Sequence, residues 1–377
     1  MSIRLVKIID GLLGRVLTMS LPTHAVQAMP APPHSILIIR PGGIGDAALL
    51  VPAIRHLRQV LPDVQITILA ERRNAAVFNL IPGIARVLCY DRPADLLSTL
   101  STSYNLVIDT EQWHRLSAVV ARFIRAPITI GFATNERRRM FTHTVPYSHD
   151  DYEAESFLRL LEPLGLATPA DREPPFLIIP ETVAIRTRDL LTPLCGRPYL
   201  VIFPGASIAE RHWGAENYRE VALKLAAATG LKIVVAGGTV DQAEAAVIAG
   251  TQGVSLAGKT SLVETAALIA EAQLLISADS GLLHIAVGLG VPTLSLFGPG
   301  IAAKWAPRGE RHRAINHQLP CSPCTRFGTT PPCPNDVRCM QEITPTEVFE
   351  TALQLLTLNL EICNDVTQTF LLERKIC

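Results

Sequence analysis

The sequence has no excess of either charge: among its 377 residues, Lys and Arg together number 34, and so do Asp and Glu. A net charge of zero disfavours a broad basic surface for nucleic acid. The chain also has no unbroken apolar run of the roughly 18 residues needed to cross a membrane. Charged residues make up 18% and hydrophobic residues 48%, so large cores can form. These absences leave a globular protein whose length suits two domains of about 150–200 residues each.

The first twenty residues have helical spacing but lack a targeting signal. One helical face carries Leu5, Ile9, Leu12, Leu13 and Val16, and the other carries Arg4, Lys7, Asp10 and Arg15. Asp10 and Arg15 interrupt any signal-type apolar run. We expect this helix either to dock on its own protein or to lie on the inner face of a membrane. The protein is expected to be cytoplasmic.

Strands and helices alternate in the first half of the chain. Residues 35–40 form an apolar run that is typical of a buried parallel strand, and a glycine-rich turn and a helix over residues 46–60 follow it. Residues 64–70 and 106–109 are the next predicted strands. This order predicts a doubly wound parallel sheet.

The same pattern restarts in the second half, with strands predicted at residues 199–203, 231–238, 274–277 and 292–297. A proline-containing stretch over residues 168–197 lacks a long periodic segment and is the expected linker. We therefore predict an α/β protein with two Rossmann-like domains facing a cleft, whose ligands lie at the carboxyl ends of the strands. The predicted parts are an amino-terminal extension (1–33), a first Rossmann-like domain (34–175), a second Rossmann-like domain (190–355) and a tail (356–377).

The first predicted strand leads into a loop with Gly42, Gly43 and Gly45. Glycines there permit a tight turn and close approach of the backbone to a ligand. The loop departs from the Gly-x-Gly-x-x-Gly dinucleotide pattern, and the carboxylate of Asp46 would repel a phosphate, so a NAD site is disfavoured. Asp46 suits a general base at the cleft, although a carboxylate that merely caps the helix is the plain alternative.

Three loops of the second half could converge on a nucleotide diphosphate, because each follows a predicted strand. They offer backbone amides, hydroxyls and a guanidinium, which are the groups that neutralise a diphosphate leaving group. The candidate donor-binding residues are Ser207, Arg211, Gly238, Thr239, Lys259, Asp279, Ser280, Gly281 and His284. Singly, each has a plain alternative: Asp279 as a helix cap, His284 as a hydrogen-bonded, semi-buried histidine, Lys259 as a surface charge.

Together these segments resemble glycosyltransferase family nine, the heptosyltransferases of lipopolysaccharide core synthesis, over about residues 35–355. The signatures are Gly45-Asp46 with Leu50-Val51-Pro52-Ala53, the stretch from Pro204-Gly205-Ala206 to Arg211-His212-Trp213, and Asp279-Ser280-Gly281-Leu282-Leu283-His284. The last continues through Gly290-Val291-Pro292 to Phe297-Gly298-Pro299.

The resemblance implies a GT-B fold and metal-independent, inverting transfer of a sugar, typically heptose from ADP-heptose. It implies that Asp46 removes the acceptor's hydroxyl proton. Arg211, where the family often has Lys, would bind donor phosphate, and Asp279, Ser280 and Gly281 would hold the diphosphate and sugar. No Asp-x-Asp motif follows a predicted strand, which is consistent with transfer without a metal, and no cofactor is expected.

The acceptor implied by the resemblance is a lipid-linked glycan of the lipopolysaccharide core, and a peripheral contact with the inner membrane would accompany it. The acceptor-side candidates are Gly43, Gly45, Glu111, Arg137 and Arg138, with Trp113, His114, Asn135 and Arg139 as further ones. The charged run over residues 136–139 would bind phosphate or carboxylate groups of the acceptor. Its plain alternative is a solvated loop.

Four of the eight cysteines, Cys321, Cys324, Cys333 and Cys339, cluster among prolines. Their spacing is compatible with a structural metal or a redox link, but unligated thiols in a structured loop are the favoured interpretation. A cytosolic setting disfavours stable disulfides.

Two rival functions share the predicted scaffold. A nucleotide-sugar epimerase would convert the sugar nucleotide without an acceptor, so product analysis without acceptor separates it from a transferase. A non-catalytic member would bind sugar nucleotide or glycan without turnover. The presence of Asp46 together with Arg211 and Asp279 disfavours that second rival.

Overall fold

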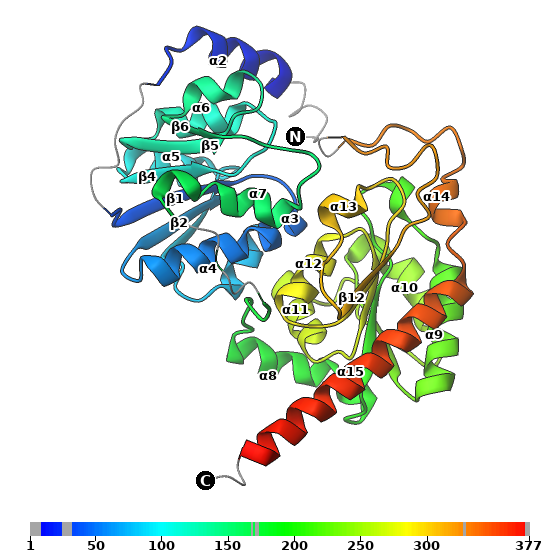
Figure 1. Ribbon diagram of the computed structural model, residues 1–377. Helices are drawn as coiled ribbons and strands as arrows, with labels where there is room; N and C mark the ends of the chain where they lie inside the picture. The colour runs from blue at the N-terminus through cyan, green and yellow to red at the C-terminus, as the bar shows by residue number, and fades with distance from the viewer. Residues whose placement is uncertain (1–8, 25–31, 167–168, 170–172, 327–328, 374–377) are drawn as a thin grey trace. The chain divides into compact units, whose positions relative to one another are not determined.

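The computed structural model of the chain describes residues 9–24, 32–166, 169, 173–326 and 329–373. The chain divides into two compact units, Met1–Ile178 and Ile179–Cys377. Each unit is built on one six-stranded sheet, and every strand pairing in both sheets is parallel (Figure 1). The prediction of two doubly wound Rossmann-like folds is therefore confirmed.

Unit 1 has the strand order β3-β2-β1-β4-β5-β6. Its strands are β1 (Ser35–Arg40), β2 (Gln65–Ala70), β3 (Arg86–Cys89), β4 (Leu106–Asp109), β5 (Ile128–Phe132) and β6 (His143–Val145). Its helices are η1 (Asp10–Gly14), α2 (Arg15–Ser20), α3 (Ile44–Leu49), α4 (Val51–Val60), η2 (Ala75–Leu80), α5 (Pro93–Ser101), α6 (Leu116–Phe123), η3 (Glu136–Met140), α7 (Glu153–Arg159) and η4 (Glu162–Leu164).

Helices cover both faces of the first sheet, so its central strands are apolar except at their ends. Leu37 and Ile39 of β1 pack in one core with Ala118 and Ala121 of α6. Because side chains alternate along a strand, Ile36 and Ile38 face the other side, and both are also buried. On that other side α7 contacts α3 and α4.

Unit 2 repeats the topology with the order β12-β11-β10-β7-β8-β9. Its strands are β7 (Tyr199–Phe203), β8 (Lys232–Val235), β9 (Val254–Ser255), β10 (Leu275–Ala278), β11 (Thr293–Leu296) and β12 (His312–Ile315). Its helices are α8 (Glu181–Leu190), η5 (Thr192–Leu194), η6 (Ala209–Arg211), α9 (Ala215–Thr229), η7 (Thr239–Asp241), α10 (Gln242–Ala249), α11 (Leu262–Ala270), α12 (Gly281–Gly288), α13 (Ala302–Trp305), α14 (Arg338–Gln341) and α15 (Pro345–Glu373).

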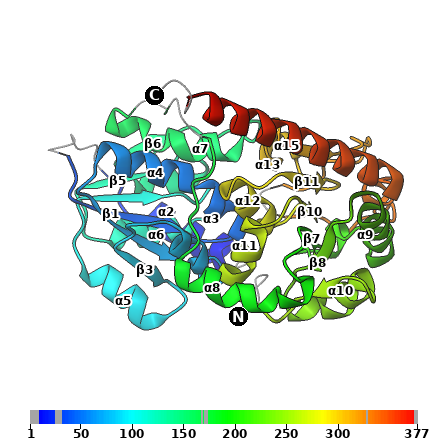
Figure 2. The same ribbon diagram turned by 90° about the horizontal axis from the view of Figure 1, so that it is seen from below.

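One face of the second sheet is covered by α9, α10 and α15, whose buried side chains share a core with Leu200 and Ile202 of β7. The long helix α15 lies along α9 in both views (Figures 1 and 2). Among the helices of the other face, α11 packs against α8 and α12. In each unit the first strand lies between the second and the fourth, which puts a topological switch point beside β1 and beside β7.

Several predicted boundaries differ from the structure. The helix expected to begin at Asp46 begins at Ile44 and is divided at Leu50 into α3 and α4. Inside the stretch expected as a linker, the chain forms helix α8. The expected border at residue 356 falls within α15. Residues 1–8 and 25–31 of the amino-terminal extension lie outside the described residues, as do residues 374–377 of the tail.

Candidate active site

Asp46 stands at the switch point of unit 1, in the first turn of α3 directly after β1. The residue at the amino-terminal cap of α3 is Gly43, so Asp46 is not the capping residue. Its side chain is 28% exposed. A partly exposed carboxylate at the carboxyl edge of a doubly wound sheet is placed to meet a ligand.

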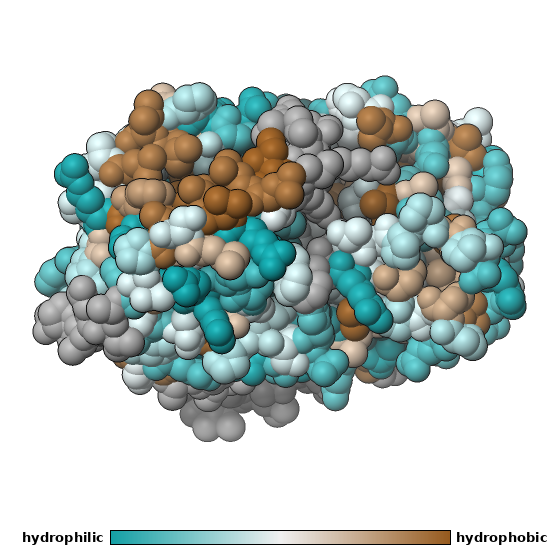
Figure 3. Space-filling view, turned by 90° about the horizontal axis from the view of Figure 1, so that it is seen from above, coloured by the Kyte–Doolittle hydropathy of each residue, from teal (hydrophilic) through white to brown (hydrophobic). Residues whose placement is uncertain are grey.

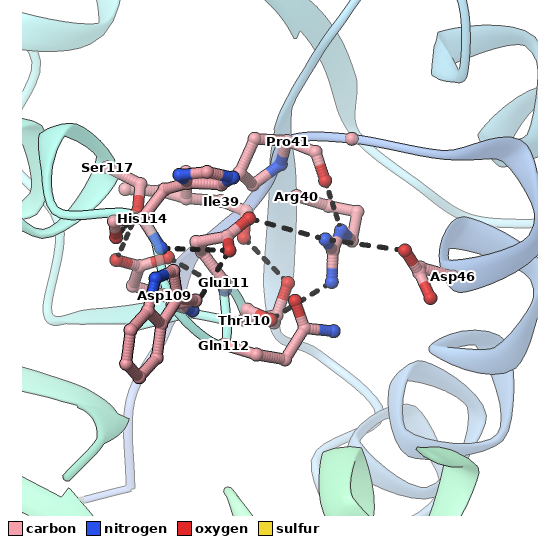
Figure 4. A network of polar contacts seen from close by, with 12 residues as sticks. Ile39, Arg40, Pro41, Asp46, Asp109, Thr110, Glu111, Gln112, His114 and Ser117 are labelled. Carbon is pink, nitrogen blue, oxygen red and sulfur yellow. Dashed lines mark hydrogen bonds and ion pairs between the residues drawn. The ribbon is translucent and has the colours of Figure 1, made fainter. Parts of the chain in front are cut away.

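A buried guanidinium lies behind this carboxylate (Figure 4). The side chain of Arg40, at the end of β1, is 1% exposed, and its Nη2 is 3.9 Å from Asp46 Oδ2 and 3.7 Å from Glu111 Oε2. Arg40 also donates hydrogen bonds to the carbonyls of Pro41 and Thr110. One cation is thus fixed between two carboxylates, and one of these, Asp46, reaches solvent.

Glu111 is held in turn by the loop after β4. Its Oε1 accepts hydrogen bonds from the amides of Trp113, at 3.0 Å, and His114, at 3.1 Å. Burial alone would raise the pKa of Glu111, but Arg40 and the other cations nearby bring that pKa below its usual value. Glu111 is therefore ionised and anchors Arg40, rather than being open to a ligand as expected of an acceptor-side residue.

The position of the Arg40 guanidinium explains why a glycine stands at position 42. Gly42 has φ of +99°, and a Cβ there would lie 3.2 Å from Nη2 of Arg40. A side chain at Gly42 would be strained and would press on the guanidinium. Gly43 and Gly45 follow at the beginning of α3, beside Asp46.

The predicted acceptor arginines differ sharply in exposure. Arg137 is fully buried, and its Nη2 lies 2.7 Å from Oδ2 of Asp109, which is also fully buried. Arg137 donates further hydrogen bonds to the carbonyls of His114 and Phe132. Arg138 is exposed. Arg137 therefore fastens η3 to β4, and Arg138 is the one of the two whose cation a ligand can reach.

In unit 2, the loops after β7 and β10 meet through an ion pair between two predicted residues. Nη1 of Arg211 lies 3.1 Å from Oδ2 of Asp279, and the two side chains are 17% and 9% exposed. Ser280, and not Asp279, occupies the amino-terminal cap position of α12, and its hydroxyl pairs with that of Ser277 instead of capping the helix. The backbone amides of this helix end remain directed at the loop.

Neighbouring loops close on this pair. A Cβ at Gly300, after β11, would lie 2.4 Å from Oδ2 of Asp279. A Cβ at Gly205, after β7, would lie 2.8 Å from Asp241, whose Oδ2 accepts a hydrogen bond from the amide of Gly238 at 2.7 Å. Loops from four adjacent strands therefore converge at one edge of the sheet, and three of them are the loops that the sequence analysis singles out.

The buried groups of this cluster are electrostatically unusual. Burial, together with the nearby charge of Arg211, lowers the pKa of His284 to about 4, so the ring is neutral near pH 7. Burial raises the pKa of Asp279, against the opposing effect of Arg211. Within the part of the chain that the structure describes, Nε of Arg211 and Nδ1 of His284 are buried without a hydrogen-bond partner. Two such atoms beside the Arg211–Asp279 ion pair can be satisfied by a bound ligand or by ordered water.

The remaining predicted donor residues are at the periphery. Ser207, Gly238, Thr239 and Lys259 are exposed at the carboxyl edge of the sheet, and Gly281 begins α12. Nζ of Lys259 donates a hydrogen bond to the carbonyl of Ser255 at 2.9 Å.

Two buried charged residues near these clusters were not predicted from the sequence. Arg40 had one signal, a cation that ends an otherwise apolar strand. Lys304 in α13 is fully buried, with its Nζ 5.9 Å from the centre of the Trp305 ring, shortly after the Gly298–Gly300 turn that packs on Asp279. Its signal is a lone lysine among small and apolar residues after a glycine turn.

The four clustered cysteines lie near one another with free thiols. Burial raises the pKa of Cys339, and the thiols of Cys324, Cys333 and Cys321 raise it further. Over the described residues, no three His, Cys, Asp or Glu side chains are grouped so that they could hold a metal ion.

Two Rossmann-like units, one with a carboxylate at its switch point and one with convergent cationic loops, define a GT-B type protein. A sequence model of glycosyltransferase family 9 (heptosyltransferase) matches residues 95–333, and the chain belongs to this family. The predictions of the fold, the family and a glycosyltransferase are confirmed.

Individual relatives agree with the family. The chain is 25% identical to lipopolysaccharide heptosyltransferase 1 of Pseudomonas aeruginosa over 317 residues, which cover 77% of this chain and 86% of that protein. The solved structure of ADP-heptose LPS heptosyltransferase II from E. coli superposes with a TM-score of 0.70 at 22% identity, covering 86% of this chain and 99% of that one. E. coli heptosyltransferase WaaC with ADP-2-deoxy-2-fluoro heptose gives a TM-score of 0.67 at 19% identity, covering 85% and 99%.

Proposed function

We propose that this chain transfers heptose from ADP-heptose to a glycan acceptor of the lipopolysaccharide core or a related glycan, by metal-independent displacement with inversion. The names of the relatives support both substrates: one is a lipopolysaccharide heptosyltransferase, and another was solved with a fluorinated ADP-heptose. The position of Asp46, beside Arg40 at the switch point of unit 1, is the observation that carries the proposal.

In the proposed reaction, Asp46 takes the proton of an acceptor hydroxyl as that oxygen attacks the anomeric carbon of the donor. A bond forms between the acceptor oxygen and the anomeric carbon, while the bond from that carbon to the phosphate oxygen breaks. ADP leaves with the electron pair. The heptose is joined to the acceptor with inverted configuration, because attack and departure take place on opposite faces.

The departing diphosphate carries negative charge that unit 2 would neutralise. Arg211 supplies a partly exposed guanidinium with an unsatisfied buried Nε. The first amides of α12, at Ser280 and Gly281, add the positive end of a helix dipole. These fixed donors would stabilise the charge that develops in the transition state, the work that a divalent metal does in other transferases. The exposed Ser207, Gly238, Thr239 and Lys259 would border the donor.

On the acceptor side we propose the exposed Arg138 as the cation that meets phosphate or carboxylate groups of the glycan. Gly43 and Gly45 would allow the acceptor close to Asp46, and Arg137 and Glu111 would keep the surrounding loops in place. A lipid-linked acceptor requires the enzyme to work at a membrane surface, and we propose a peripheral contact with the inner face of the inner membrane. Among the described helices, none is both long and apolar enough to cross a membrane.

A screen of ADP-, UDP- and GDP-sugars against the purified protein tests the donor. Thermal stabilisation by ADP-heptose, and ADP release that depends on an added heptose-deficient core acceptor, are the expected results. A shift in melting temperature with UDP- or GDP-sugars but none with ADP-heptose would overturn the donor assignment. Conversion of ADP-heptose to an isomer without acceptor would identify an epimerase instead.

A further inference from the structure

The segment formed by η1 and α2 attaches to unit 1 by its polar and small side chains. Asp10, Gly14 and Thr18, spaced four residues apart, are all buried. Asp10 accepts hydrogen bonds from the amides of Arg115 and Leu116, both at 2.8 Å, at the beginning of α6. A Cβ at Gly14 would lie 2.9 Å from Cβ of Arg115, so the segment packs closely.

Its apolar side chains consequently point outward. The exposed fractions are 70% for Leu12, 49% for Leu13, 60% for Val16 and 58% for Met19. Figure 3, which views the molecule from the side of α2, shows a band of hydrophobic side chains at the end where α2 lies in Figure 1. Helices on globular proteins normally bury such a stripe, and contiguous exposed apolar surface marks an interaction site. The helix docks on its own protein, which is one of the two expectations from the sequence. It docks through its polar and small side chains, and its apolar face points away.

The charges around this apolar face are predominantly positive. The Arg15 side chain is 63% exposed. Arg138 is exposed on η3, and Arg139 of η3 donates a hydrogen bond to the carbonyl of Thr18 at 3.2 Å. The neighbouring Glu136 is neutralised by ion pairs with Arg15, at 3.4 Å, and Arg115, at 2.7 Å.

We infer that the outward face of η1 and α2, formed by Leu12, Leu13, Val16 and Met19, inserts into the surface of an anionic lipid bilayer. Aliphatic side chains enter the boundary between headgroups and acyl chains, and the arginines at their edge bind lipid phosphates. The inference deepens the proposed function, on whose membrane contact it rests, by naming the surface and the lipid charge. It also places η3, with the acceptor-side Arg138, against the layer that would hold a lipid-linked glycan, because η3 contacts α2.

Charge favours a bilayer over a second copy of the chain. Two copies joined through this face would bring the same arginines together, and like charges at an interface repel. An anionic bilayer supplies the opposite charge over the whole cationic edge.

Vesicle flotation of the full-length protein, without donor or acceptor, tests the inference. The wild type is expected to bind vesicles of phosphatidylethanolamine with phosphatidylglycerol, and to bind pure phosphatidylcholine vesicles at least about tenfold more weakly. Leu12→Gln combined with Val16→Gln is expected to reduce binding to the anionic vesicles about tenfold or more. Leu97→Gln, which changes an equally exposed leucine (66%) on α5, is the matched control and should bind like the wild type.

Equal binding by the wild type and the double variant, or no binding by the wild type, would overturn the inference. A wild type that dimerises without binding vesicles, together with a double variant that is monomeric, would also overturn the inference. In that case a second copy of the chain would cover the face. Turnover of a water-soluble acceptor should be unchanged in the double variant. That activity is measured without vesicles, so failure of vesicle binding and failure of the proposed transfer are separate results.

Discussion

Nη2 of Arg40 lies 3.9 Å from Oδ2 of Asp46, and the same nitrogen lies 3.7 Å from Oε2 of Glu111. The buried guanidinium therefore joins an anchored carboxylate of the β4 loop to the partly exposed carboxylate of α3. This geometry fixes the position of Asp46 through a residue whose side chain is only 1% exposed.

Arg40 is accordingly expected to act as a positioning residue. Arg40→Ala should lower kcat about a hundredfold, because Asp46 loses its fixed orientation. KM for ADP-heptose should change little, because the proposed donor residues belong to unit 2. Guanidinium ion at millimolar concentration should restore part of kcat in Arg40→Ala, which a general loss of structure would not allow. A variant with unchanged kcat, or with no response to guanidinium, would contradict this role.

Arg211 should act on the donor instead. Arg211→Ala is expected to weaken ADP binding and to lower kcat/KM by about 10²–10³, since a charge-stabilising donor is lost. Arg211→Lys keeps the charge without the planar fork and should recover part of the activity. Isothermal titration with ADP and steady-state kinetics measure the two effects. Retention of full ADP affinity in Arg211→Ala would argue against the assignment.

Substitutions of the two neighbouring arginines of η3 should affect different properties, stability for Arg137 and acceptor binding for Arg138. Arg137→Met leaves Asp109 buried without its cation and is expected to cost about 3–5 kcal/mol of unfolding free energy. Arg138→Met lies at an exposed position and should cost less than about 0.5 kcal/mol, while it raises KM for the acceptor. Chemical denaturation and acceptor titrations provide the comparison. Equal stability of the two variants would refute the structural role of Arg137.

Much of the fold could be predicted because central parallel strands are buried on both faces. Tyr199–Phe203 is a continuous apolar run, Leu106–Asp109 is apolar up to its last residue, and both form strands with those bounds. Strand β5 escaped prediction since Gly131 interrupts it. That glycine is required by tertiary packing, because the ring of Phe141 occupies the place where a Cβ would stand. Strand β12 was not predicted either, because His312 and Arg313 interrupt its apolar pattern. It lies at the edge of the sheet, where polar residues are tolerated.

The site residues that could be predicted are those in loops that directly follow a predicted strand. Arg211 and Asp279 could be expected together, because the carboxyl ends of neighbouring parallel strands share one edge. The link from Arg40 to Glu111 depends on β1 lying beside β4, an adjacency that no local pattern encodes. The inward turn of Asp10 likewise depends on the distant beginning of α6, which it caps.

Acid should destabilise the protein through its buried histidines. His284 has a pKa of about 4 when folded, below its usual value of 6.5. Above pH 6.5 both states are neutral and stability is complete; as pH falls from 6.5 towards 4, only the unfolded state takes up the proton. This single group should therefore remove about 3 kcal/mol of unfolding free energy over that window. His312, whose pKa burial also lowers to about 4, adds to the effect.

Denaturant unfolding at pH 7 and pH 4.5 checks this prediction. The loss of stability between the two values should be smaller in His284→Gln than in the wild type. His34→Gln, at an exposed histidine, is the control and should behave as the wild type does. Identical pH dependence in the wild type and His284→Gln would refute the account of His284.

The most direct measurement of the central claim is the turnover of Asp46→Asn with ADP-heptose and a core acceptor, alongside its affinity for ADP. Asparagine keeps the size of the side chain but cannot take a proton. We predict that kcat falls by about 10²–10⁴, the usual contribution of general-base catalysis, while the Kd for ADP stays within about twofold of the wild type. An Asp46→Asn enzyme with wild-type kcat would contradict the assignment of Asp46 as the base.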